Sequence, residues 1–514
     1  MTSITPHENN LNRSARLLPP AARYALLLAG CVAAALASGS RWDVMLAAWI
    51  APVLVLRFSR DSGVATATLG SITAALVQTA TYLVANAIPF NAMTAALGAV
   101  VSVAYASPAI LDRTIGRQLP LGQRIFLFPA AAVTVEFLVG AILPLGTAVG
   151  MRAITQAENL AFVQILSVTG PYAVAFLIGC VATVANLIFE SPSSKSTRRW
   201  SIGLTATLAT VITAGQLRLD AATPSGAARS VMVAAVTPDL HARLSANNLL
   251  STSPHLPPGQ LAPDNSTIRA ANLEIADGLL KLTDGAARAG ARIIVWSETA
   301  AASTEKDKAA LLARIALLAR QGRIYINATI GVPRERNEMY LFGPAGQQLW
   351  HYRKNHPVPG MEPVAPFSNP VPVAVTPYGR LAGLICFDGD FPGLARVDAD
   401  ILLAPSWDWP EVSFTHTMRM VRLRAIENGY SLIRPVFNGV AGAFDGYGRV
   451  LAMQSTMSPG AHVMMVELPV GETATIYGKI GDAFAWLGMV LLAVLISTRL
   501  WRMLPMRRAV IGSQ

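Results

Sequence analysis

Eight long apolar stretches with few or no charged residues constrain this chain more than any other feature. A helix that spans a membrane needs about 20 mostly apolar residues, and five of the stretches come close to or exceed that length. We therefore expect about seven spans before a long polar region and one span after it. The stretches occupy residues 24–38, 44–56, 64–88, 92–111, 125–143, 161–188, 202–214 and 483–500.

Composition excludes an ordinary soluble enzyme and a disordered chain. Of the 514 residues, 53% are hydrophobic and only 14% are charged, whereas soluble domains carry about 25% charged residues. The net charge of +11 suggests a nucleic-acid partner at first sight, but residues 217–482 hold 24 Lys and Arg against 23 Asp and Glu. The excess lies in the apolar flanks, which is typical of a membrane protein and not of a basic binding face.

The short loops between the stretches predict the orientation in the membrane. With seven spans and then one, fifteen Lys and Arg fall in loops on one side, and only Arg41 and Arg152 fall on the other. Positive charge favours the cytoplasmic side. Both termini are therefore expected in the cytoplasm and residues 217–482 on the opposite side. The expected sides are the same if the first two short stretches form a hairpin that does not span the membrane.

The polar region alternates apolar β-type runs with helical patterns, which indicates an α/β layer fold. Its length, about 266 residues, suits one domain. Helices are expected at 270–289, 308–319 and 414–427. Strands are expected at 231–236, 292–296, 324–332, 339–342, 349–353, 373–375, 381–385, 401–403, 432–436, 440–444 and 463–467.

Three cysteines are present, and only one of them lies in the polar region. Cys31 and Cys180 fall inside apolar stretches, which leaves Cys386 without a partner for a disulfide. A lone thiol of this kind is either a small buried apolar residue or a nucleophile. The histidines are scattered and no CxxC occurs, so no metal site is expected.

Polar residues follow three of the expected strands, and α/β folds usually place their sites at such strand ends. Glu298 follows the run 293–296, and taken alone it would more often cap a strand or a turn. Lys354 follows 349–353, where a solvated surface lysine is the common case. Cys386 begins a turn rich in Gly, Pro and Asp, which favours an exposed elbow over a core position.

Glu298, Lys354 and Cys386 follow one another at intervals of 56 and 32 residues. This order resembles the nitrilase, or carbon–nitrogen hydrolase, superfamily, whose αββα sandwich carries a Glu–Lys–Cys triad. The resemblance covers about residues 231–467, and four downstream motifs support it. These motifs lie at 402–409, 422–429, 434–440 and 444–450.

A nitrilase-like domain between seven spans and an eighth resembles the apolipoprotein N-acyltransferase family. Residues 164–172 and Asn186 are similar to the family's sixth-span motif, and residues 475–482 resemble its return into the last span. The resemblance implies a membrane domain at 1–216, a catalytic domain at 217–482 and a final span with a basic tail at 483–514. It also implies a bacterial inner membrane, with the catalytic domain in the periplasm.

Several positions depart from the family pattern. Ser297 stands where the family usually has Pro, and Met361 stands where it usually has Gly, although Glu362 is kept. Phe387 and Asp388 replace the usual Tyr and Glu. An aromatic substrate-loop residue of the family has no evident counterpart within residues 240–264.

The resemblance implies acyl transfer through a thioester. Glu298 would take the proton of Cys386, since a free thiol with a pKa of about 8.5 is mostly protonated. Lys354 would stabilise the oxyanion, and Glu362, with Phe387 and Asp388 nearby, would support the site. A phospholipid would donate the acyl chain, and the amine of a diacylglyceryl-cysteine lipoprotein would accept it. No nucleotide, metal or other cofactor is expected, and the protein is expected to be a monomer.

Two other functions remain open on the sequence. The first is a membrane-tethered amidase or nitrile hydrolase that uses the same three residues with water as the acceptor. The second is a catalytically silent membrane scaffold. A serine hydrolase is disfavoured because no GxSxG occurs. Glu136, an acidic residue within a stretch, fits a functional role and a helix-packing role about equally.

Overall fold

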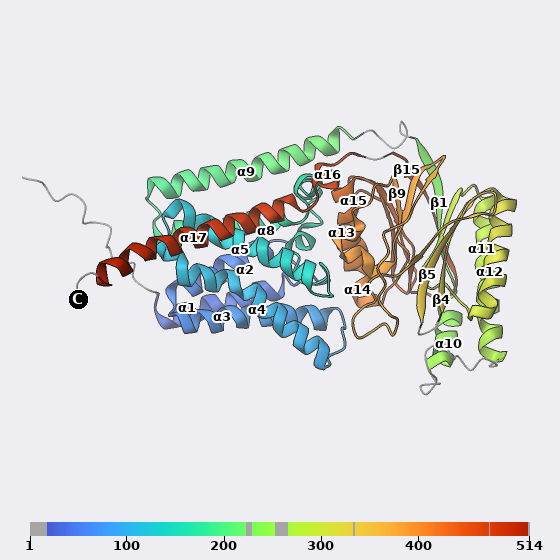
Figure 1. Cartoon of the computed structure of the whole chain (residues 1–514), viewed down its shortest axis with the longest axis horizontal. Coiled ribbons are helices and arrows are strands. Elements are labelled where there is room, and N and C mark those ends of the chain that lie inside the picture. The colour runs from blue at the N-terminus through green and yellow to red at the C-terminus, as the bar shows by residue number, and fades with distance from the viewer. Residues whose placement is uncertain (1–17, 223–228, 252–265, 333–334, 472, 512–514) are drawn as a thin grey trace, which may run out of the picture.

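The computed structural model describes residues 18–222, 229–251, 266–332, 335–471 and 473–511. A bundle of helices and an α/β sandwich lie end to end along the long axis of the molecule (Figure 1). The polar region is therefore attached to one end of the bundle. The polypeptide enters and leaves this region through helices that run along the bundle.

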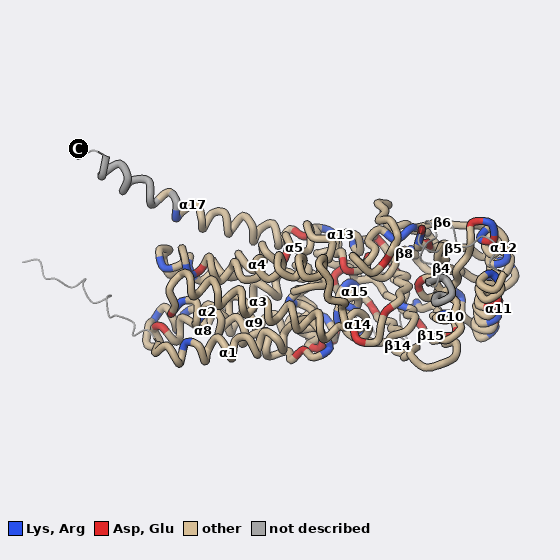
Figure 2. The backbone as a smooth tube through the Cα atoms, turned by 90° about the horizontal axis from the view of Figure 1, so that it is seen from below, with Lys and Arg blue, Asp and Glu red and all other residues tan. Residues whose placement is uncertain are grey.

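Within the described residues, five helices are long and apolar enough to cross a membrane: α3, α4, α5, α8 and α9. Charged residues lie at the two ends of the bundle and are sparse along its middle (Figure 2). The total of eight spans stays a prediction, because α1, α2 and α17 have shorter apolar segments. The bundle helices are α1 Pro20–Ala35, α2 Ala47–Asp61, α3 Val64–Ala85, α4 Ala92–Ile115, α5 Leu121–Ile142, α8 Tyr172–Glu190, α9 Lys195–Asp220 and α17 Ala483–Ile511.

The apolar stretch at 161–188 does not form the single helix that its composition predicts. Two short helices, α6 (Leu160–Val163) and α7 (Leu166–Thr169), precede α8. The break falls at Gly170, whose φ of +65° suits glycine, and the ring of Tyr477 lies where a Cβ would be. The stretch at 202–214, by contrast, belongs to a longer helix, α9, which ends at Asp220 and so passes the expected domain boundary at 216.

The polar region folds into two large sheets that pack face to face between two layers of helices, and β10 and β12 form a separate two-stranded sheet. One sheet has the strand order β15-β1-β2-β4-β5-β6, and the other has the order β14-β13-β11-β9-β8-β7. Helices α11 (Ser266–Arg288) and α12 (Glu305–Gly322) cover the outer face. Helices α13 (Pro392–Ala395), α14 (Pro410–Phe414) and α15 (Arg422–Asn428) lie between the second sheet and the bundle (Figure 1).

Continuous apolar runs explain why the central strands are buried on both faces. Every residue of β2 and β4 is buried, as expected for parallel neighbours that are covered on both faces. The run in β2 is wholly apolar, whereas β4 also holds the buried polar residues Asn327 and Thr329. The expected strands are all present, with bounds that shift by a few residues. The strands are β1 Ser230–Thr237, β2 Ile293–Trp296, β3 Ala301–Ala302, β4 Tyr325–Val332, β5 Arg336–Phe342, β6 Gln348–Arg353, β7 Val373–Thr376, β8 Gly379–Gly383, β9 Ile401–Leu403, β10 Ser406–Trp407, β11 Ser431–Arg434, β12 Val436–Phe437, β13 Val440–Phe444, β14 Val450–Ser455 and β15 His462–Pro469.

The sandwich is joined to the bundle by hydrogen bonds between segments that are distant in sequence. The Thr147 hydroxyl donates to the Asp390 carbonyl at 2.7 Å. The indole N–H of Trp409 donates to the Asn86 carbonyl at 2.5 Å. These bonds hold the loops at the carboxyl ends of β8 and β9 against the bundle, so the candidate site lies at the junction of the two parts.

Candidate active site

Glu298 is buried in the turn that follows β2 and accepts hydrogen bonds on both carboxylate oxygens. Oε1 accepts from Asn337 Nδ2 at 2.6 Å and from Lys354 Nζ at 2.8 Å. Oε2 accepts from the backbone N–H of Trp407 at 2.6 Å. Burial raises the pKa of Glu298 above its usual range, although Lys354 opposes that rise. A carboxylate with a raised pKa and a fixed position is suited to proton transfer.

Lys354 follows β6 and points inward, so the alternative of a solvated surface lysine is wrong. It is only 2% exposed and pairs with Glu298 and with Glu362, whose Oε1 lies 2.5 Å from Nζ. Burial alone would lower the pKa of Lys354, but the two carboxylates raise it well above the usual value. The two carboxylates therefore favour the ammonium form of this buried side chain. Glu362 also accepts from the Val358 backbone N–H at 3.2 Å, which fixes the loop after Lys354.

Cys386 stands at a strained turn between β8 and the short helix η3 (Cys386–Asp390). Its φ of +49° is unusual for a residue with a side chain, and such strain is often found at functional positions. The thiol faces the Trp407 carbonyl with Sγ at 3.9 Å from the oxygen. The elbow is buried, with Cys386 only 6% exposed, so the expectation of an exposed elbow is wrong. Burial and the charge of Glu298 raise the pKa of the thiol well above its usual value.

Asp388 connects the elbow to the end of β6. Its buried carboxylate accepts from the Tyr352 hydroxyl at 2.9 Å and from the His356 backbone N–H at 2.8 Å. It also accepts from the backbone N–H of Ile385 at 3.2 Å. The sequence placed Asp388 among the supporting residues, and in the structure its bonds join the backbone that carries Cys386 to the backbone that carries Lys354.

An apolar cavity of about 90 Å³ has Cys386 in its wall. Phe387 lines it from the elbow, and Met361 lines it from the loop that ends at Glu362. The remaining wall comes largely from the helical bundle. Bundle residues that line the cavity include Tyr82, Leu83, Leu97, Gly98, Val101 and Leu145. The thiol therefore lies next to an apolar space that the bundle and the sandwich form together.

A buried polar group in the same cavity wall escaped the sequence reasoning. His416 lies in the π-helical segment η4 (Thr415–Val421) and lines the cavity together with Asp408. Asp408 is held by the Arg434 guanidinium through bonds of 2.8 and 2.9 Å. Asp390 lies behind them, with an oxygen 3.6 Å from His416 Nε2. These residues follow no motif in common, and only the fold brings them together.

Arg243, on α10 (Leu240–Ser251), is a second group that the sequence did not indicate. Its guanidinium carbon lies 5.2 Å from the centre of the Trp407 ring, and its Nε donates to the Thr299 carbonyl at 3.0 Å. Burial lowers the pKa of Arg243 to about 10. This contact braces the turn that carries Glu298, in which Thr299 has a φ of +43°. The aromatic residue sought within 240–264 is not identified, and residues 252–264 lie outside the described part of the chain.

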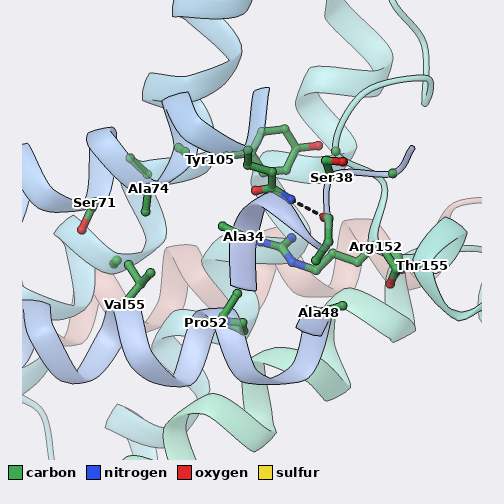
Figure 3. A pocket seen from close by; sticks show the side chains of 18 of the residues that line it. Ala34, Ser38, Ala48, Pro52, Val55, Ser71, Ala74, Tyr105, Arg152 and Thr155 are labelled. Carbon is green, nitrogen blue, oxygen red and sulfur yellow. Dashed lines mark hydrogen bonds between the residues drawn. The ribbon is translucent and has the colours of Figure 1, made fainter. Parts of the chain in front are cut away.

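A second cavity, of about 80 Å³, lies within the helical bundle, and its lining residues do not include Cys386 (Figure 3). Small residues such as Ala34, Ala48 and Ala74 line much of it. Arg152 lies at its wall, bonded to Glu136 at 3.1 Å and with its guanidinium carbon 5.7 Å from the centre of the Tyr105 ring. Glu136 thus pairs with Arg152 inside the fold, a contact of the kind that one of its two expected roles, helix packing, requires.

The arrangement around Cys386 contains what nucleophilic acyl chemistry requires. A protonated thiol, a hydrogen-bonded carboxylate and a buried ammonium belong to one network. A carbonyl carbon at the thiol could be attacked there, with a proton acceptor and a cation in reach. The apolar cavity favours a substrate with a hydrocarbon portion over a small polar amide.

Two family models match the chain over separate regions. The apolipoprotein N-acyltransferase N-terminal domain matches residues 29–184, and the carbon–nitrogen hydrolase domain matches residues 260–477. Together they account for the bundle and for the sandwich, in the order in which the chain presents them.

Several curated proteins that resemble the chain are named apolipoprotein N-acyltransferase. An apolipoprotein N-acyltransferase of Geobacter metallireducens is 28% identical, over 38% of this chain and 43% of that protein. One from Bradyrhizobium diazoefficiens is 25% identical, over 67% of each chain. Among solved structures, an amidase from Nesterenkonia sp. is 18% identical, over 49% of this chain and 94% of that one, with a TM-score of 0.37.

Proposed function

We propose that this chain, a member of the apolipoprotein N-acyltransferases of the nitrilase superfamily, adds an acyl chain to the N-terminus of lipoproteins through a thioester on Cys386. The donor is a phospholipid, and the acceptor is the N-terminal amine of a diacylglyceryl-cysteine apolipoprotein. The protein acts as a monomer in the bacterial inner membrane. The sandwich faces the periplasm, and both termini lie in the cytoplasm.

The observation that carries this proposal is the shared cavity at Cys386. Its walls come from α3 and α4 of the bundle and from the elbow of the sandwich. A hydrocarbon chain that enters between the membrane helices would therefore reach the thiol. A hydrocarbon chain gains about 0.8 kcal/mol for each CH₂ it buries. A soluble amide would gain little from such a space, which favours an acyl lipid as the first substrate.

The first half-reaction transfers the acyl group from oxygen to sulfur. Glu298 takes the thiol proton as Sγ attacks the ester carbonyl carbon, and Lys354 stabilises the oxyanion that forms. The C–O bond then breaks, and Glu298 returns the proton to the departing glycerol oxygen. The products are a lysophospholipid and an acyl thioester on Cys386.

The second half-reaction transfers the acyl group from sulfur to nitrogen. The acceptor amine attacks the thioester carbonyl, and Lys354 again stabilises the oxyanion. As the C–S bond breaks, Glu298 carries a proton from the nitrogen to the sulfur. The products are an amide and the free thiol, so the enzyme returns to its starting state.

The two departures beside the thiol fit this chemistry. Asp388 bonds to the backbone on both sides of the site, so its carboxylate supports the geometry and takes no proton in the cycle. Phe387 lines the apolar cavity, where an aromatic ring without a hydroxyl contacts a hydrocarbon chain without burying an unpaired polar group.

Complementation in a bacterium depleted of its own lipoprotein N-acyltransferase tests the proposal. Expression of this chain should restore growth and an N-terminal amide-linked acyl chain on lipoproteins, whereas Cys386→Ala at equal abundance should not. Release of free fatty acid from phospholipid, without any amide product in the presence of the lipopeptide amine, would indicate a hydrolase instead. Absence of both products would indicate a scaffold.

A further inference from the structure

A short segment of the chain connects the carboxylate of Glu298 to the thiol of Cys386. The Cys386 backbone N–H donates to the Pro405 carbonyl at 2.9 Å, and the Glu298 backbone N–H donates to the Ser406 carbonyl at 3.3 Å. The backbone N–H of Trp407 donates to Glu298 Oε2 at 2.6 Å, and its carbonyl faces Sγ of Cys386. This segment therefore sets the spacing between the base and the nucleophile of the proposed cycle.

Arg243 of α10 joins this segment to the turn that carries Glu298. Its guanidinium carbon lies 5.2 Å from the centre of the Trp407 ring, and its Nε donates to the Thr299 carbonyl at 3.0 Å. Thr299 follows Glu298 and has a φ of +43°, which is costly for a β-branched residue. One guanidinium thus holds a strained turn against the residue that donates to the carboxylate.

Packing alone gives a weak reason for an arginine at this position. The side chain is only 4% exposed. Among the residues that the structure describes, no carboxylate pairs with Arg243 and nothing accepts a hydrogen bond from its Nη1. A buried cation without an anionic partner costs stability, and an apolar side chain of similar volume is often better tolerated. The described residues that line the cavity at Cys386 do not include Arg243, so its influence on the reaction would pass through its two contacts.

We propose that Arg243 is a positioning residue for the reaction at Cys386. By holding the Thr299 turn against Trp407, it keeps the Glu298 carboxylate within reach of the thiol. A guanidinium combines donors in its plane with a face that stacks on aromatic rings, and neither lysine nor an apolar side chain offers both. The inference rests on the proposed role of Glu298 as the base, and it applies whether the acyl acceptor is an amine or water.

Loss of Arg243 should make Glu298 easier to protonate. The N–H of Trp407 stabilises the ionised carboxylate, because a donor bonds more strongly to an anion than to a neutral acid. A relaxed turn weakens that bond and so raises the pH at which the base becomes protonated. Removal of a buried positive charge acts in the same direction. The other charged or titratable groups that face the carboxylate are unchanged by the substitution, and they are Lys354, Glu362 and Cys386.

The test measures kcat/KM for acylation of Cys386 between about pH 4 and about pH 9 in purified full-length protein. The donors are a phospholipid and the chromogenic ester p-nitrophenyl butyrate. Arg243→Met should lower the plateau about 100-fold with both donors, because a misplacement of about 1 Å has an effect of that size. Its acid midpoint should lie about one pH unit above that of wild type.

A second substitution tests whether Arg243 acts through Trp407. Trp407→Leu removes the ring under the guanidinium but keeps the backbone N–H, and it should raise the acid midpoint in the same way. The double variant should differ little from either single variant, because two residues that act through one contact are not additive. Additive shifts would show that the contact between Arg243 and Trp407 is not the one that positions the base.

Arg449→Met is the matched control. The Arg449 guanidinium also lies beside a ring, with its carbon 5.4 Å from the centre of Tyr447, and it also donates to a backbone carbonyl, that of Leu219. Its contacts among the described residues do not include Glu298 or Trp407. The control should therefore keep the wild-type acid midpoint.

The acid midpoint decides between positioning and folding, because loss of folded enzyme lowers a rate without moving the midpoint. An unchanged or lower midpoint in Arg243→Met, or an equal rise in the control, would overturn the inference. Arg243→Gln takes its place if the methionine variant does not fold, and failure of both to fold would show that Arg243 serves the fold itself. A wild-type enzyme that reacts with the chromogenic ester but not with phospholipid would overturn the proposed donor alone. Failure with both donors would overturn the proposed function and, with it, the role of Glu298.

Discussion

Lys354 Nζ lies 2.8 Å from Glu298 Oε1 in a pair that is almost wholly shielded from solvent, with side chains 1% and 4% exposed. Such a pair is costly to bury unless further hydrogen bonds satisfy its remaining atoms. Here Asn337, Trp407 and Glu362 supply them. The arrangement keeps an ammonium and a proton acceptor together in one buried network with the thiol, which is the basis of the predictions that follow.

Replacing Lys354 tests the oxyanion role against a purely structural one. Lys354→Arg should reduce thioester formation about as severely as Lys354→Ala, by about 10²–10³-fold. The broad planar fork of arginine does not fit where a compact ammonium reaches two carboxylates. Rates are compared at equal amounts of folded protein in detergent. Near-normal acylation by the arginine variant would show that only the charge of Lys354 matters.

Acidification should stop the first half-reaction at a higher pH than an ordinary glutamate would allow. The base works only when ionised, and burial raises the pKa of Glu298 above its usual value of about 4.3. Thioester formation should therefore fall as the pH decreases, with a midpoint above that value. Glu362→Gln removes a neighbouring charge that raises this pKa, so its midpoint should lie lower. A midpoint near or below 4.3 in the wild-type enzyme would exclude Glu298 as the base.

The residues of the candidate site were predictable where they follow the ends of strands. Glu298, Lys354 and Cys386 each follow an apolar β-run, and their order along the chain indicated that they belong together. Two details were not predictable. The polar turn after Cys386 suggests a solvent-exposed position, but the helical bundle covers the turn. A local sequence pattern does not predict burial by a distant part of the chain. His416 and Asp390 are 26 positions apart and meet only because η4 packs on the elbow.

The fold was predictable to a similar degree. Buried strands appear as continuous apolar runs, but β14 (Val450–Ser455) lies at a sheet edge and is only partly buried, so its pattern gave no signal. The short helix α10 was missed because its sequence is weakly amphipathic. The break at Gly170 depends on the approach of Tyr477, which is over 300 residues away in the sequence. Contacts of this kind override local propensity.

Filling the shared cavity should impair long acyl donors selectively. Gly98→Leu places a side chain in the space between α3 and α4, where the nearest atom to a new Cβ is Thr79 Cγ2 at 3.4 Å. Thioester formation from a phospholipid with long chains should fall about 100-fold, while a short-chain ester should react almost normally. Gly122→Leu on α5 is the matched control, because nothing lies within 4 Å of its new Cβ. Equal losses with both esters would contradict the assignment of the cavity to the acyl chain.

Reporter fusions test the orientation that the arginine and lysine bias predicts. A reporter that is active only outside the cytoplasm should work when fused near Asn265, and one that is active only inside should work after Gln514. The fifteen-to-two distribution of basic residues between the loops is the reason. The opposite pair of results would place the sandwich in the cytoplasm and remove it from its proposed substrates.

Mass spectrometry of the intact protein after incubation with phospholipid alone is the most direct test of the thioester on Cys386. Without an amine acceptor the cycle should stop after its first half, so the mass should increase by one fatty acyl chain that neutral hydroxylamine removes. Cys386→Ser and Glu298→Gln should not form the adduct, because one lacks the nucleophilic thiol and the other cannot accept its proton. Replacing both Cys31 and Cys180 with Ala should leave the adduct unchanged. An adduct on Cys180, or one that persists in Cys386→Ser, would contradict the account.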